Sequence, residues 1–156
     1  MRLDRSWIER NIPHHGRMCL LDEVIEWDAQ HIRCRSGTHR SPNHPLRSRN
    51  RLSAACGIEY AAQSMAVHGA LSQGTGGGAG GAPAARSEVG FLAGLRDVVS
   101  QVTRLDDIEA DLYSEAALIA GDHGSALYEF VLTSEARRLL SGRATVVFDA
   151  NKRFTL

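Results

Sequence analysis

The stretch from Arg51 to Leu71 constrains the fold most, because it has the composition of a helix that is apolar on nearly every side. Between Leu52 and Leu71 the only carboxylate is Glu59. A helix without a polar face lies in the middle of a fold. We therefore expect the other elements to pack around this helix and to carry Glu59 into the interior, where burial favours the protonated carboxyl group.

Three polar residues refine the interpretation of this helix. Gln63 follows Glu59 by four residues, so the two side chains lie on the same helical face. Ser53 is the predicted N-cap. The segment is long enough to cross a bilayer, but Glu59, Gln63 and His68 within it argue against a membrane span. The sequence predicts a buried central helix instead.

The composition is that of one globular domain, residues 1–156. The chain is 43% hydrophobic, and its 18 basic and 18 acidic residues cancel. This length can bury a substantial core, and the zero net charge gives no indication of binding to nucleic acid or to a membrane surface. The three cysteines, Cys19, Cys34 and Cys56, have no CxxC spacing, which argues against a disulfide framework and a zinc site. The N-terminus lacks a signal-peptide pattern, so we expect a cytoplasmic protein.

Charge is distributed less evenly along the chain than in total. Arginines crowd the approach to the central helix: Arg33, Arg35, Arg40, Arg47, Arg49 and Arg51. A later segment is acidic: Asp106, Asp107, Glu109, Asp111 and Glu115. A solvated face is the usual explanation of such runs, and a docking surface is the alternative.

The remaining pattern predicts strands on both sides of the central helix. A short helix is expected at 4–11. The predicted strands are 18–27, 31–36, one within 89–102, 108–113, 126–133 and 143–148, with a hairpin turn at 121–124 and a polar turn that ends at Gly142. In the strand at 31–36, Ile32 and Cys34 alternate with arginines, which indicates one buried and one solvated face. This order is α+β, with a curved antiparallel sheet wrapped around one long central helix, as in a hot-dog fold.

Two connections have distinctive compositions. Residues 37–50 contain two prolines and little apolar content, which predicts a loop leading into the helix. Residues 72–86, SQGTGGGAGGAPAAR, are of low complexity and predict a flexible Gly-rich loop. No GK[ST] follows these glycines, so they do not indicate a phosphate-binding loop.

Three motifs, in order, resemble those of the 3-hydroxyacyl-acyl-carrier-protein dehydratases of bacterial fatty-acid synthesis. IPHHGRMCLLDEV (12–24) is similar to their LPHRxPFLLVDRV, GIEYAAQ (57–63) to their IEAxAQ, and VGFLAGLRDV (89–98) to their FFxGIDxxRF. LSAACGIEYAAQ (52–63) also resembles VPAWVGIEYMAQ of the divergent dehydratases of aryl-polyene clusters. Three motifs in the right order are more specific than any one of them.

The resemblance has one departure, which concerns the catalytic histidine. The fatty-acid enzymes carry it in a GHFPG loop just before the helix, where this chain has PLRSRNRLSA (45–54). His14, in IPHHG, matches the histidine of the opening motif. By resemblance we rank His14 first as the base, His39 second and His44 third. The alternative is that these histidines are structural or solvated.

The resemblance implies dehydration of a 3-hydroxyacyl thioester. This reaction needs a base for the C2 proton and an acid for the leaving hydroxyl group. The resemblance implies His14 as the base, and Glu59 either as the acid or as the group that positions the water. We expect unpaired amides of Ala54 and Ala55 at the helix start to hold the thioester oxygen, and we group Gln63 with them as substrate-binding. No metal or other cofactor is required.

The resemblance also implies partners. The substrate would arrive on an acyl carrier protein, which is acidic, so the arginine cluster gains weight as a docking face. Hot-dog dehydratases form their acyl tunnel between subunits, which implies a homodimer or a higher homo-oligomer. Two alternatives remain: a hot-dog thioesterase, and a non-catalytic acyl-binding subunit.

Overall fold

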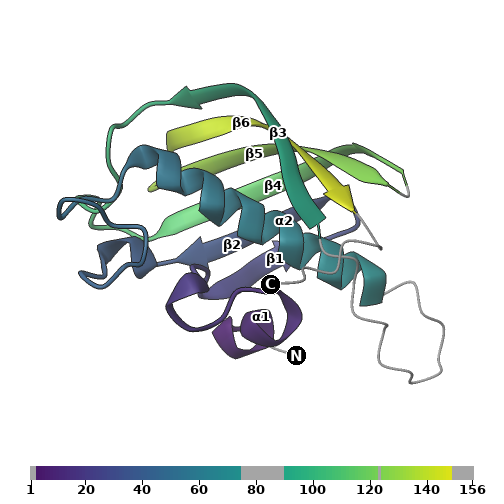
Figure 1. Cartoon of the computed structure of the whole chain (residues 1–156), viewed down its shortest axis with the longest axis horizontal. Coiled ribbons are helices and arrows are strands. Elements are labelled where there is room, and N and C mark those ends of the chain that lie inside the picture. Colours follow the sequence, from purple (N-terminus) through teal and green to yellow (C-terminus); the bar gives the residue numbers. More distant parts are fainter. Residues whose placement is uncertain (1–2, 75–89, 123, 149–156) are drawn as a thin grey trace, which may run out of the picture.

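The computed structural model describes residues 3–74, 90–122 and 124–148. The elements, in chain order, are α1 (Arg5–Asn11), η1 (Gly16–Met18), β1 (Glu23–Trp27), β2 (His31–Ser36), η2 (Thr38–Arg40), η3 (Ala54–Cys56), α2 (Gly57–Gly74), β3 (Gly90–Ser100), β4 (Leu112–Gly121), β5 (Ser125–Ser134) and β6 (Arg137–Phe148). Figure 1 shows the strands curving behind α2, with α1 beyond the β1 side of the sheet.

All six strands form one antiparallel sheet in the order β1-β2-β4-β5-β6-β3. The helix α2 packs against the central strands, where Tyr60, Val67 and Leu71 of the helix join Phe130 and Leu132 of β5 in the core. The predicted α+β architecture, with a sheet wrapped around one long helix, is confirmed. Its order leaves β1 and β3 as the two edges.

The central helix, predicted at 51–71, starts and ends later than predicted: the α-helix begins at Gly57, after the 3₁₀ turn η3, and continues to Gly74. Ser53 does cap this start, since its hydroxyl accepts a hydrogen bond from the amide of Ala55. Gly57 is required by close packing. A Cβ there would lie 2.8 Å from Leu140 and 2.9 Å from Leu132, so glycine allows the helix to approach the sheet.

The strand boundaries depart from the prediction at three places. β1 is limited to Glu23–Trp27, because Leu20 bonds to the central helix rather than to a neighbouring strand. Residues 108–111 precede β4 and are not a strand. The last hairpin turns at Glu135 and Ala136, with φ of 50° and 63°, whereas Gly142 lies within β6. Such turns usually carry Gly or Asn, and neither residue is present at 135–136 to indicate the turn.

Half of the arginine cluster is paired with the acidic segment. Arg35 binds Asp111 at 2.9 Å, Arg40 binds the same carboxylate at 2.8 Å, and Arg33 lies 3.5 Å from Glu115. These three charges of the predicted basic face are therefore neutralised within the fold. This correction leaves the loop arginines 47, 49 and 51 without a carboxylate partner among the described residues.

Two further predictions concern the Gly-rich loop and the three cysteines. Ser72–Gly74 of the predicted Gly-rich loop belongs to α2, and its remainder, 75–86, lies outside the described residues. Cys19 and Cys34 are buried as expected, but Cys56 is only half-buried, and all three are free thiols. No helix in the described part of the chain is long and apolar enough to span a membrane.

Candidate active site

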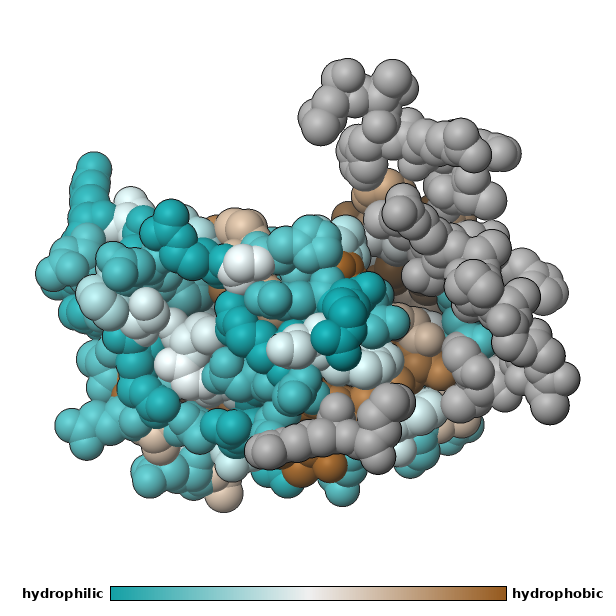
Figure 2. All heavy atoms as spheres, turned by 90° about the horizontal axis from the view of Figure 1, so that it is seen from below, coloured by the Kyte–Doolittle hydropathy of each residue, from teal (hydrophilic) through white to brown (hydrophobic). Residues whose placement is uncertain are grey.

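A cavity of about 240 Å³ lies beside α2, between that helix, the segment after α1 and the strands β3, β5 and β6. The α2 residues that line it recur at helical spacing: Glu59, Ala62, Met65, Ala66, Gly69 and Ala70. The opposite side is formed by Phe91, Leu92, Tyr128, Val146 and Phe148. Figure 2 shows the face that carries α1, where hydrophobic atoms gather toward the end of α2 and the rest of the described surface is mainly hydrophilic.

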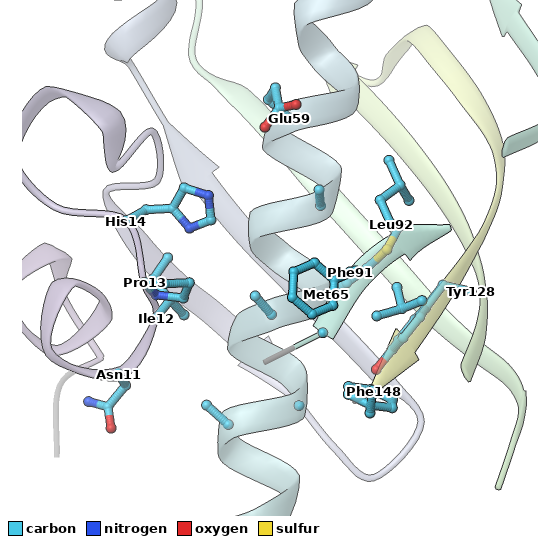
Figure 3. A pocket seen from close by; sticks show the side chains of 16 residues that line it. Asn11, Ile12, Pro13, His14, Glu59, Met65, Phe91, Leu92, Tyr128 and Phe148 are labelled. Atoms are coloured by element: carbon cyan, nitrogen blue, oxygen red, sulfur yellow. The ribbon is translucent and has the colours of Figure 1, made fainter. Parts of the chain in front are cut away.

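His14 reaches the cavity from the segment that follows α1. That helix ends at Asn11, and Ile12 and Pro13 lead the extended chain past α2. Figure 3 shows the imidazole of His14 directed toward α2. Burial lowers the pKa of His14, nearby Glu59 opposes this shift, and His15 adds to it. Nδ1 of His14 is buried and has no hydrogen-bond partner among the described residues. The imidazole is thus held neutral beside the cavity.

Glu59 lies in the first turn of α2 and lines the same cavity as His14. Its side chain is exposed, so the prediction that the fold buries it is wrong for the single chain. The reason is that α2 packs only one face on the sheet, and position 59 is on the face that borders the cavity. No ion pair of Glu59 occurs among the described residues.

Gln63 is buried and both ends of its side chain have hydrogen-bond partners. Its side-chain carbonyl accepts from the amide of Leu20 at 2.8 Å, and its amide group donates to the carbonyl oxygen of Met18 at 2.7 Å. Both ends of the side chain are therefore occupied by the segment that follows His14. Gln63 does not line the cavity, and the expectation that it is free to bind substrate is wrong.

The amides of Ala54 and Ala55 are also occupied. The Ala54 amide donates to the carbonyl oxygen of Thr103 at 3.1 Å, and the Ala55 amide donates to the hydroxyl of Ser53 at 3.3 Å. Unpaired amides were expected here because a helix start leaves donors unused. Instead, the antiparallel β-bridge between Ser53 and Arg104 accompanies the hydrogen bond of the Ala54 amide, and the Ser53 side-chain cap satisfies the Ala55 amide.

His39 and His44 lie away from the cavity and have structural partners. The buried His39 places Nε2 2.8 Å from the carbonyl oxygen of Ile108. His44 places Nε2 3.0 Å from the hydroxyl of Tyr60, and its Nδ1 accepts from the amide of Leu46. Of the three ranked histidines, only His14 shares a cavity with Glu59.

Sequence reasoning missed the residues that shape the cavity. Ala62, Ala66 and Ala70 recur every four residues, which places them on one helical face and could have marked a groove. The aromatic residues opposite them gave no such signal, because Phe91, Tyr128 and Phe148 are brought together only by the strand order β5-β6-β3.

The comparisons with known proteins agree with this architecture. A family model described as ApeP-like, ApeP dehydratase, matches residues 6–155. The solved structure "The Dehydratase Heterocomplex ApeI:P from Xenorhabdus doucetiae" is 23% identical, with a TM-score of 0.78 over 92% of this chain and 91% of that chain. No curated protein matches the sequence.

More distant structures share the fold. A hypothetical thioesterase with coenzyme A from Streptococcus pneumoniae TIGR4 is 9% identical, with a TM-score of 0.57 over 84% of this chain and 88% of that chain. A mutant of the thioesterase PA1618 from Pseudomonas aeruginosa is 9% identical, with a TM-score of 0.54 over 80% and 78%. These likenesses establish the hot-dog fold and do not distinguish between its chemistries.

Proposed function

The chain belongs to the ApeP-like dehydratase family, and we propose that it dehydrates a 3-hydroxyacyl thioester, delivered by an acyl carrier protein in the cytoplasm, to the 2-enoyl thioester. The observation that carries this proposal is the presence of His14 and Glu59 in one cavity whose other lining residues, apart from Asn11 and Tyr128, are apolar. The motif resemblance to aryl-polyene dehydratases agrees with it.

The two side chains supply the two proton transfers of the elimination. The pKa of His14 is lowered by burial, so its imidazole is neutral and able to remove the C2 proton as a general base. Glu59 would donate a proton to the leaving 3-hydroxyl group, which departs as water; this role depends on a second subunit that covers the carboxyl group, because burial favours the protonated form. The base is left protonated and the acid ionised, and proton exchange with solvent restores both.

The rest of the cavity holds the acyl chain. Beyond Glu59, the wall on α2 consists of small side chains and Met65, and the wall on the sheet is aliphatic and aromatic. An apolar acyl chain gains roughly 25 cal/mol for each Å² that it removes from water. Its thioester end would lie beside His14 and Glu59 and its distal end toward Tyr128 and Phe148, which Figure 3 shows on the side away from Glu59.

A second hot-dog subunit would complete this site along β3. Four apolar side chains of this edge strand, Leu92, Leu95, Val98 and Val99, are between 38% and 49% exposed. An exposed, apolar edge strand of 11 residues is a pairing surface, and Leu92 also lines the cavity. A subunit paired there would enclose the cavity and cover Glu59, which strengthens proton transfer by excluding water.

The partner is either a second copy, as the sequence resemblance implies, or a different dehydratase subunit, as in the heterocomplex of Xenorhabdus doucetiae. Light scattering of the purified chain distinguishes them. A dimer at micromolar concentration identifies the partner as a copy. A monomer that gains activity only with a second hot-dog subunit identifies a heterocomplex, and a monomer that is fully active alone contradicts the proposed assembly.

The carrier protein would dock on the loop before η3. Arg47, Arg49 and Arg51 have no carboxylate partner among the described residues, and this loop lies at the same end of α2 as Glu59. Acidic carrier proteins are complementary to such a surface. Docking there would bring the thioester to the end of the cavity that holds the two catalytic groups.

Mass spectrometry of a panel of 3-hydroxyacyl-carrier proteins incubated with this protein tests the function. Dehydration removes one water mass from the acyl carrier, whereas hydrolysis releases the free carrier. Loss of water is the expected result. Release of free carrier would identify a thioesterase instead, and an unchanged panel, with and without the second subunit, would identify a non-catalytic acyl-binding subunit.

A further inference from the structure

The part of the cavity remote from His14 contains a buried polar pair that the proposed reaction does not use. The hydroxyl of Tyr128 lies 2.8 Å from Nδ1 of His68, and Nε2 of His68 lies 2.9 Å from the carbonyl oxygen of Asp28. The two rings meet edge to face, with centroids 5.6 Å apart. Tyr128 is 3% exposed and lines the cavity, whereas His68 is 1% exposed and lies behind it.

The position of this pair matches the distal end of a bound acyl chain. His68 follows Glu59 by nine positions of α2, which corresponds to about 14 Å along the helix axis. Figure 3 shows Tyr128 and Phe148 at the end of the cavity away from Glu59. A chain whose thioester lies beside Glu59 therefore extends toward Tyr128.

The hydrogen bonds fix which atom of the pair donates. A carbonyl oxygen only accepts, so Nε2 of His68 carries a proton and donates it to Asp28. Burial lowers the pKa of His68, so the ring is neutral and its Nδ1 has only a lone pair. The Tyr128 hydroxyl must then donate to Nδ1. Its oxygen keeps lone pairs that no described residue uses.

We propose that Tyr128 is a specificity-determining residue, whose oxygen accepts a hydrogen bond from a hydroxyl group at the distal end of the acyl chain. This inference rests on the proposed acyl-binding function of the cavity. Figure 3 shows Phe148 beside Tyr128 at this end of the cavity, and Phe148 offers no polar side-chain group. A distal hydroxyl group would lose its hydrogen bonds to water there unless Tyr128 replaced one of them.

The direction of the hydrogen bond from Tyr128 to His68 determines which distal groups Tyr128 can bind. Because the Tyr128 proton is already given to His68, a distal group that only accepts hydrogen bonds, such as a methyl ether, gains nothing. We expect the cavity to favour a hydroxyl end over a methoxy end of the same chain. One neutral hydrogen bond corresponds to roughly a three- to tenfold difference in affinity.

The test is calorimetric binding of amide analogues of acyl-pantetheine, which cannot be turned over, to the full-length protein in its purified assembly. An alkyl series first identifies the length at which added carbons stop increasing affinity. Chains of that length ending in hydroxyl, methoxy or methyl groups are then compared on the wild type and on Tyr128→Phe. The matched control is Tyr60→Phe, which removes another buried phenol that does not line the cavity.

The expected result is a preference for the hydroxyl end that Tyr128→Phe reduces by roughly three- to tenfold and Tyr60→Phe leaves unchanged. Equal hydroxyl preference in the wild type and Tyr128→Phe would overturn the inference while leaving the dehydratase assignment intact. A preference for the methoxy end over the hydroxyl end would also overturn the inference. Binding of none of the analogues would overturn both the inference and the acyl-binding function on which it rests.

Discussion

Two parts of the surface of α2 differ in whether their polar groups have hydrogen-bond partners. Where the helix meets the sheet and the segment after α1, Gln63, Ser64 and His68 are buried, and each has hydrogen-bond partners. Where the helix borders the cavity, Glu59 is exposed, and His14 of the facing segment keeps a buried ring nitrogen without a partner among the described residues. Satisfied polar groups stabilise the fold, whereas unsatisfied ones remain available to a ligand. The difference separates the structural polar residues from the two that we propose to be catalytic.

The largest effect is expected from Glu59→Gln on the cavity face. The amide is nearly isosteric but cannot serve as a general acid, so turnover should fall by about 10² to 10⁴. The side chain is exposed, so the free energy of unfolding should stay within about 0.5 kcal/mol of the wild type. Steady-state kinetics and urea unfolding of the same preparation measure both. A large loss of stability would show that Glu59 has a structural role.

Gln63→Leu, at a polar side chain that is hydrogen-bonded within the fold, should show the reverse pattern. It leaves the carbonyl of Met18 and the buried amide of Leu20 without their partner, which should cost roughly 2–4 kcal/mol of unfolding free energy. The control is Gln73→Leu, an exposed glutamine near the end of α2. Urea unfolding should give equal stability for the control and the wild type. Equal stability of both variants would refute the structural role of Gln63.

The buried histidines should make the fold sensitive to acid. Burial lowers the pKa of His39, His44 and His68 from the ordinary value of 6.5. The unfolded chain therefore takes up protons at a higher pH than the folded one, and stability present above pH 6.5 is lost as the pH falls. Each histidine contributes at most about 1.4 kcal/mol per pH unit.

His39→Gln isolates one of these contributions, because glutamine keeps a donor for the carbonyl of Ile108. The difference in unfolding free energy between pH 7.5 and pH 5.5 should be smaller in this variant than in the wild type. Chemical denaturation at both values provides the comparison. The same difference in both proteins would show that His39 does not contribute to the acid sensitivity.

The smallest effect concerns the loop arginines. Arg51→Glu should raise KM for a carrier-bound substrate roughly two- to tenfold at low salt, and added salt should remove the difference. KM for the same acyl group on pantetheine should not change. Arg138→Glu makes the same charge change at an exposed position of β6 and serves as the control. An equal rise in both variants would point to net charge rather than a docking surface.

The sequence predicted the fold better than the site. The apolar pattern of 52–71 and the alternation at 31–36 identified the central helix and β2, because both depend on local periodicity. The last turn was misplaced, because Glu135 and Ala136 adopt positive φ without the residues that normally favour it. His14 was identified by motif resemblance, because hydrophobic periodicity does not distinguish one histidine from another.

The errors at the site share a physical cause. Sequence periodicity places Glu59 and Gln63 on one helical face, but it cannot tell which neighbouring segment each contacts. Gln63 meets the backbone of Met18 and Leu20, while Glu59 meets the open cavity. The partners of Ala54 and Ala55 are likewise residues distant in the chain or a cap. Such contacts are set by tertiary packing.

The central claim is that His14 and Glu59 act together across one cavity, and a double-mutant cycle tests it most directly. The measurement is kcat/KM for dehydration by His14→Ala, Glu59→Gln and the double variant, with folding verified for each. Residues that act as a unit are not additive, so the double variant should lose little more activity than either single variant. A loss equal to the product of the two single losses, or full activity of a folded Glu59→Gln protein, would contradict the account.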